Sequence, residues 1–233
     1  MKKQLLATAL LLGVLMPVNA EVNPGLDPLR DDEYKTLHSM GCMMLRECTE
    51  DVYEVKSIRD FEDFYGTDFS DLSLAEKAEI DDLIRYSNEA GVKVFLGSER
   101  YFPALHRGVY HTVGNNFFLN DSYMGEGKTL LSVLRHEGWH AAQDCMAGSI
   151  DNNSIAIIHM EEDVPLQHQV MAQTTYPENV VPWEQEAAWA GNTEGMTVDA
   201  LAACAAPAPM WEVYEPTPLT REWLEEKGYL TES

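Results

Sequence analysis

A short run in the middle of the chain has the residue types and spacing of a metal-dependent catalytic site. Residues 136–140 read His-Glu-Gly-Trp-His, which is the pattern HExxH. On a helix, two histidines four residues apart project from one face, so both imidazoles can bind a single metal ion. An ion with an open coordination position lowers the pKa of a bound water to about 7. Glu137 would lie beside that water as a general base, because it shares the helix with both histidines.

A third protein ligand is expected further along the chain. The residues after His140 contain no histidine at the spacing HExxHxxGxxH, which excludes the metzincin pattern. Two carboxylates instead lie close together in the segment WEQEAAWA, at Glu184 and Glu186. Either one could complete the site with His136 and His140.

The segment from about residue 92 to residue 191 resembles the gluzincin group of zinc metallopeptidases. The resemblance rests on HExxH in a helix, on a preceding strand that reads FFLN and on a following helix that carries ExEA. It implies a zinc ion held by His136, His140 and a downstream glutamate, with Glu137 as the general base. HExxH carries most of this resemblance, because ExEA is a much less specific motif.

The choice of the third ligand depends on how the ExEA segment aligns with the gluzincin pattern. Relatives with an ExEAD pattern use the first glutamate, which corresponds to Glu184, and their aspartate supports a zinc histidine. Ala188 stands where that aspartate would be. Sliding the pattern by two residues makes Glu186 the ligand, so both glutamates stay candidates, with Glu184 preferred. The glutamate that is not a ligand would lie on a solvated face or form a hydrogen bond with His140.

Two further features could contribute to catalysis. Amide hydrolysis needs a hydrogen-bond donor for the developing oxyanion, and Tyr176 or His168 could supply it. By analogy with gluzincins, strand Asn116–Asn120 is expected at the edge of the sheet, where it could pair with an extended substrate. Its Phe117, Phe118 and Leu119 could equally be core residues.

These residues predict an exported zinc metallohydrolase, in the first place a peptidase that acts on peptides or proteins. The alternative is a secreted metal-binding or interaction protein that keeps a zincin fold without turnover, but a binding site alone does not need the base Glu137. A third reading is a disulfide-bonded structural domain in which HExxH is accidental.

The elements that would position the site form an α+β, zincin-like domain with a short antiparallel sheet. The active-site helix is expected over residues 129–146, because this stretch has no proline and carries regularly spaced apolar residues. Ser73 and Glu76 form a capping box that opens a helix ending at Gly91. Other expected elements are a loose helix over 27–50, a strand over 92–97, a hairpin over 108–120, and helices over 165–176, 182–191 and 220–228.

Composition limits the partners and suggests the organisation of the chain. The 233 residues carry 16 Lys plus Arg against 39 Asp plus Glu, and a net charge of −23 argues against nucleic acid or an anionic membrane as a partner. The pattern favours residues 1–20 as a signal peptide, 21–91 as an N-terminal helical part, 92–204 as the zincin-like core and 205–233 as an extension. The sequence does not define an oligomeric state.

The N-terminus predicts export. Lys2 and Lys3 precede an apolar run, and cleavage is expected near Ala20, which would give a secreted or periplasmic protein. The alternative, an uncleaved anchor, is disfavoured because the run is shorter than the ~20 residues that a span needs. No later segment is apolar enough for stable membrane insertion.

The four cysteines all follow the expected signal peptide. In an oxidising compartment two disulfides are favoured, and three connectivities are possible. We expect Cys42 to pair with Cys48 and Cys145 with Cys204. The rival, a zinc site made of four cysteines, lacks the CxxC pairs typical of such sites.

Overall fold

The computed structural model describes residues 39–231 and shows an α+β fold built on one four-stranded sheet. The strand order is β1-β2-β4-β3, and the sheet is mixed: β2 and β4 run parallel, while the two outer pairs are antiparallel. The expected sheet was antiparallel throughout, so the parallel pair is a correction. The strands are β1 (Val52–Val55), β2 (Lys93–Gly97), β3 (Gly108–His111) and β4 (Asn116–Asn120).

Strand β4 lies inside the sheet, not at its edge. Its five residues are all buried, and it pairs with β2 on one side and with β3 on the other. The prediction that Asn116–Asn120 forms the edge beside the site is therefore wrong, because both sides of its backbone are occupied. The hairpin itself is confirmed, and its outer strand β3 forms that edge of the sheet.

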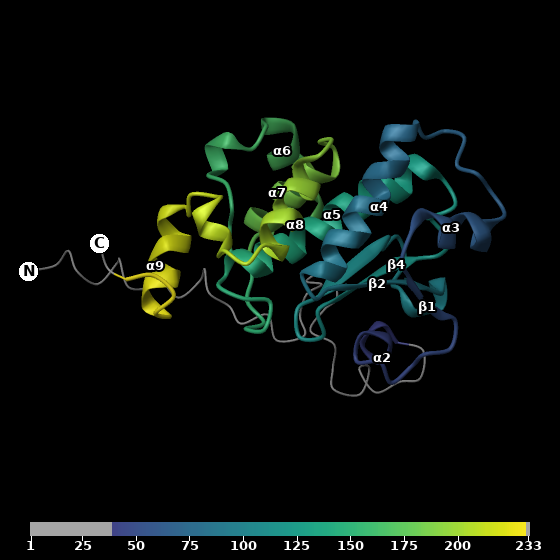
Figure 1. Cartoon of the computed structure of the whole chain (residues 1–233), viewed down its shortest axis with the longest axis horizontal. Coiled ribbons are helices and arrows are strands. Elements are labelled where there is room, and N and C mark those ends of the chain that lie inside the picture. Colours follow the sequence, from purple (N-terminus) through teal and green to yellow (C-terminus); the bar gives the residue numbers. More distant parts are fainter. Residues whose placement is uncertain (1–38, 232–233) are drawn as a thin grey trace, which may run out of the picture.

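Helices cover both faces of the sheet (Figure 1). On one face, the apolar side chains of β2 and β4 pack against α4 and α5 in the main core. On the other face, Phe95 and Phe118 stack against each other and pack with the methionines of α2. Burial on both faces explains why β4 reads as an unbroken apolar run. The helices around the sheet are α2 (Met40–Met44), α3 (Ile58–Tyr65), α4 (Leu74–Glu89) and α5 (Gly127–Met146).

The remaining helices follow α5 in the chain and gather at the other end of the molecule (Figure 1). Trp139, Ala142 and Met146 of α5 pack with alanines of α7 and α8 in a second core. Small side chains let these helices approach closely: a Cβ at Gly138 would lie 2.9 Å from Thr197 of α8. These helices are α6 (Leu166–Thr175), α7 (Val181–Gly191), α8 (Met196–Ala205) and α9 (Pro218–Glu226).

Several expected elements agree with the structure, and the N-terminal helix does not. The capping box of Ser73 and Glu76 forms as predicted. The loose helix expected over 27–50 falls partly outside the described residues, and within them only Met40–Met44 is helical. The helix ends there because the Cys42–Cys48 disulfide closes a tight loop in which Arg46 has a φ of 61°. Three elements were not expected: β1, α3 and α8.

A buried ion pair next to His136 holds α5 in place. Arg135 of α5 donates two hydrogen bonds, of 2.7 and 2.5 Å, to the carboxylate of Glu79 in α4. Glu79 also accepts the backbone N–H of Gly195, just before α8. The pair therefore joins three helices at a residue next to the metal-site motif.

Two disulfides are present, with the expected pairing. Cys42 joins Cys48, and Cys145 at the end of α5 joins Cys204 in α8. Disulfides of this kind are compatible with an extracellular or periplasmic protein. The expected signal peptide lies outside the described residues. Among residues 39–231, no helix combines the length and the apolar character needed to cross a bilayer.

Tyr110 links β3 to α5 through a buried hydrogen bond. Its hydroxyl donates to Asp144 Oδ2 over 2.7 Å, and both side chains are buried. Burial raises the pKa of Asp144 to about 8, although the hydrogen bond from Tyr110 opposes this. The edge strand is thus tied to the helix one turn beyond His140.

This raised pKa predicts how stability depends on pH. Between about pH 4 and pH 8, folded Asp144 holds a proton that the unfolded chain has released, so the free energy of unfolding falls as pH rises, by up to about 1.4 kcal/mol per pH unit. Asp144→Asn cannot ionise and should lack this loss. Urea unfolding with a chelator present, at about pH 5 and about pH 8, should show wild type losing about 2–4 kcal/mol relative to the variant.

Asp63→Asn, at an exposed position on α3 away from Asp144, is the matched control and should change the pH profile far less. Parallel profiles for wild type and Asp144→Asn would contradict a raised pKa at this residue.

Candidate metal centre

Helix α5 places both histidines of HExxH at its contact with α7. His136 and His140 lie one turn apart on the same face, with ring centroids 5.0 Å apart and planes nearly perpendicular. The His140 side chain is 9% exposed and that of His136 is 21% exposed. The site is therefore enclosed at His140 and reaches solvent at His136.

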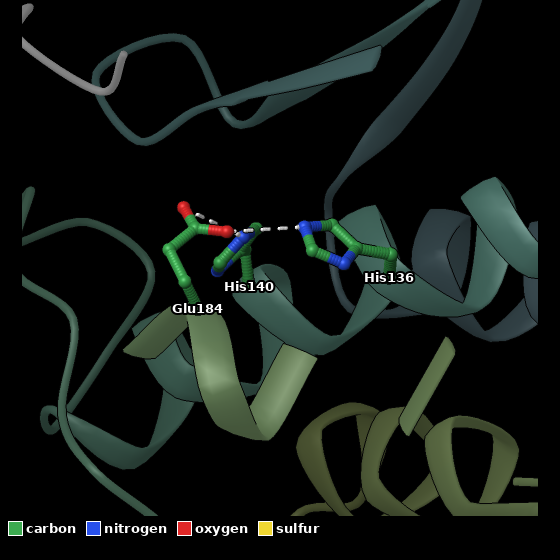
Figure 2. A group of neighbouring side chains, drawn as sticks. All are labelled: His136, His140 and Glu184. Carbon is green, nitrogen blue, oxygen red and sulfur yellow. Dashed lines mark ion pairs between the residues drawn. The ribbon is translucent and has the colours of Figure 1, made fainter. Parts of the chain in front are cut away.

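Helix α7 brings Glu184 to these histidines. Its Oε2 lies 3.3 Å from Nε2 of His136, and its Oε1 lies 3.6 Å from Nε2 of His140. Figure 2 shows the three side chains pointing toward one another from the two helices. Pro182 lies in the first turn of α7, as expected. The packing of α7 on α5 determines which side of α7 faces the histidines.

The electrostatics couple Glu184 and His140 closely. Burial opposes ionisation of Glu184, but the positive charges that His140 and His136 can carry outweigh burial and hold its pKa well below the usual range. Burial alone would lower the pKa of His140, and the Glu184 carboxylate raises it to about 9. Glu184 is thus a buried carboxylate that requires a positive partner.

The donor set fits a metal ion. His136, His140 and Glu184 each offer one ligand atom, and the three atoms all lie within 4.8 Å of one another. Two imidazoles and one carboxylate match the His2Glu ligand set of catalytic zinc sites, in which a fourth position stays open. These three residues could hold a metal ion, and the arrangement is compatible with a zincin-like site.

Glu137 points to the edge of the sheet and is not part of this ligand group. A Cβ at Gly108 of β3 would lie only 2.6 Å from Glu137 Oε1, so the strand can approach this closely because residue 108 is glycine. The backbone N–H of Tyr110 donates to the Glu137 carboxylate. Burial raises the pKa of Glu137, while the two histidines and this hydrogen bond act in the opposite direction.

Glu186 faces away from the histidines. Its carboxylate is fully buried and accepts hydrogen bonds from the backbone N–H groups of Ile158 and His159 and from the side chains of Trp139 and Gln143. Burial raises its pKa to about 7, although these four donors lower it. Its oxygens are occupied, so the structure brings only Glu184 of the two candidate glutamates to the histidines.

Gln143 is a contact of the site that sequence reasoning missed. It is fully buried, and its Oε1 lies 2.8 Å from Nδ1 of His140. The spacing of three residues from His140 was a usable signal, because side chains at that spacing share a helix face. Gly108 and Tyr110 were also missed, since nothing in the hairpin sequence shows which strand meets Glu137.

The two candidate oxyanion donors lie in different surroundings. Tyr176 follows α6, and its hydroxyl donates a hydrogen bond to the Glu184 carboxylate, which lies in the site. Burial and the charges of Glu184 and Glu137 raise the pKa of Tyr176. His168 is buried within α6, with its Nε2 3.1 Å from Nε2 of Gln167. The structure brings Tyr176, and not His168, next to Glu184.

Comparison with protein-family models, curated proteins and solved structures found no match for this chain. The roles of its residues therefore rest on geometry and chemistry.

The geometry predicts different effects for the two glutamates of α7. Glu184→Ala removes one of three ligands, so it should weaken zinc binding by more than the ~10–100-fold typical of outer hydrogen-bond partners. The carboxylate of Glu186 faces away from the histidines, so Glu186→Gln should still bind about one equivalent of zinc. Elemental analysis of protein purified without chelator, followed by chelator competition, measures both.

Proposed function

We propose that the protein is an exported, zinc-dependent metallohydrolase, and specifically a peptidase. The observation that carries the proposal is the convergence of His136, His140 and Glu184 on one point, with Glu137 next to the two histidines on α5. When bound, zinc would lower the pKa of a coordinated water to about 7 and polarise a substrate carbonyl.

Glu137 is the general base of this proposal. It would take a proton from the water whose oxygen attacks the carbonyl carbon, and would deliver that proton to the nitrogen as the C–N bond breaks. The N–H of Tyr110 holds its carboxylate toward the edge of the sheet. Because the backbone of β3 holds Glu137, its position does not depend on binding the metal ion.

The neighbourhood of β3 favours a peptide as the substrate. β3 pairs with β4 on one side, and alternate residues of an antiparallel strand direct their backbone groups to the other side. Gly108 and Tyr110, the residues that meet Glu137, are two positions apart and so share that direction. An extended peptide beside Gly108 would carry a backbone carbonyl past Glu137, while the N–H of Tyr110 stays bonded to Glu137.

Tyr176 is our candidate for stabilising the oxyanion. Its hydroxyl is protonated at neutral pH and is hydrogen-bonded to Glu184, so it could turn and donate a hydrogen bond to a negative charge that develops beside the site. Export is supported by the two disulfides and by the signal-peptide pattern of the first twenty residues.

The first prediction separates catalysis from metal binding. Glu137→Gln should keep about one equivalent of zinc and a folded structure, while hydrolysis falls ~10²- to 10⁴-fold because the base is lost. Denatured casein is a practical first substrate, with zinc content measured on the same samples. Full zinc binding without hydrolysis of any peptide by wild type would favour the non-catalytic metal-binding alternative. Unchanged activity in Glu137→Gln would place the activity elsewhere.

The second prediction concerns the oxyanion. Tyr176→Phe should lower kcat by ~10²- to 10³-fold, because one donor to the transition state is lost, with a much smaller change in KM. His168→Phe, on the same segment but away from Glu184, is the matched control for kcat and KM. Equal effects of the two variants would remove Tyr176 from the mechanism.

A further inference from the structure

The amide of Gln143 has only one orientation that satisfies its surroundings. Its Nε2 donates to Glu186 Oε2 over 2.8 Å and to the backbone carbonyl of Trp183 over 3.2 Å. Both neighbours are acceptors, so the NH2 group must face them. Turning the amide over would set an oxygen against a carboxylate and a carbonyl in a fully buried position, which costs free energy.

This orientation determines which nitrogen of His140 carries hydrogen. With its NH2 group turned to Glu186, Gln143 presents Oε1 to Nδ1 of His140 at 2.8 Å. An amide oxygen only accepts hydrogen bonds, so Nδ1 must be the donor. The lone pair of the neutral ring is then on Nε2, the atom that faces Glu184.

Glu186 in turn is held by groups outside the metal centre. Ile158 and His159 donate their backbone N–H groups to Oε1, and Trp139 donates its indole N–H to Oε2. These donors come from α5 and from the loop before α6, so the carboxylate cannot turn without leaving buried N–H groups unsatisfied.

We propose that Gln143, oriented by Glu186, is a positioning residue that fixes the Nδ1–H tautomer of His140 and so presents Nε2 to the metal ion. This inference rests on the proposed metal centre. It assigns a role to the glutamate that is not a ligand, and it places the support of His140 on its own helix.

The test measures zinc affinity by chelator competition in wild type and in Gln143→Met. Methionine has a similar size but offers His140 no strong acceptor, so zinc affinity should fall ~10–100-fold. Gln185→Met removes another buried glutamine, on α7, whose Oε1 accepts no hydrogen bond. This control should stay within about twofold of wild type.

A second variant tests whether Glu186 acts through Gln143. In Glu186→Gln, the N–H groups of Ile158 and His159 keep the new carbonyl oxygen on their side, and the new NH2 group faces Gln143. The Gln143 amide then loses its carboxylate acceptor and keeps only the Trp183 carbonyl, so its orientation, and with it the Nδ1–H tautomer of His140, is less strongly favoured. Zinc affinity should fall in Glu186→Gln but not fall further when this change is added to Gln143→Met.

A spectroscopic measurement separates this role from a structural one. In the zinc-loaded protein, NMR should show a slowly exchanging Nδ1–H proton of His140 in wild type and in Gln185→Met, and its loss or rapid exchange in Gln143→Met. Wild-type affinity and an unchanged proton in Gln143→Met, or additive effects of the two changes, would overturn the inference while leaving the metal centre in place. Failure of wild type to bind zinc would overturn the proposed function and this inference together.

Discussion

The contact between α5 and α7 buries several ionisable groups close together. The geometry of the site follows from the hydrogen bonds and opposite charges that offset the cost of burying them. An unpaired buried carboxylate costs several kcal/mol, so each carboxylate there needs donors or a positive charge. Glu184 faces the two histidines, Glu186 accepts four hydrogen bonds, and Glu137 receives the N–H of β3. Three glutamates within a small region therefore have three separate roles, set by their partners.

The sequence predicts the part of the site that depends on local spacing. Two histidines four residues apart share a helix face wherever the helix lies, so HExxH and its helix could be predicted. Glu184 and Glu186 could not be separated in the same way. Helix residues two positions apart lie about 200° apart around the axis, so the spacing puts them on different faces but does not show which face meets the histidines. Which of them faces the two histidines depends on the packing of α7 against Trp139 and Ala142, and this packing involves parts of the chain far apart in sequence.

The sheet shows the same limit of local information. The turn residues Gly114 and Asn115 predict the hairpin, and the structure contains it. The placement of β4 inside the sheet depends on its parallel pairing with β2, and β1 joins from a segment that has no distinctive strand pattern. Nothing in the hairpin shows which of its strands lies at the edge. The edge strand was therefore misassigned from the sequence, while the fold class was not.

The Cys145–Cys204 disulfide joins the last turn of the site helix to α8, and the buried core holds the same helices together. These contacts do not involve a metal ion. These contacts could hold the fold before any ion binds, unlike those of small zinc modules, whose folding free energy comes from the ion. A chain built this way can oxidise and fold first, collect its ion from the surroundings later, and exchange it without unfolding. The occupancy of the site then depends on the supply of competing ions as well as on affinity.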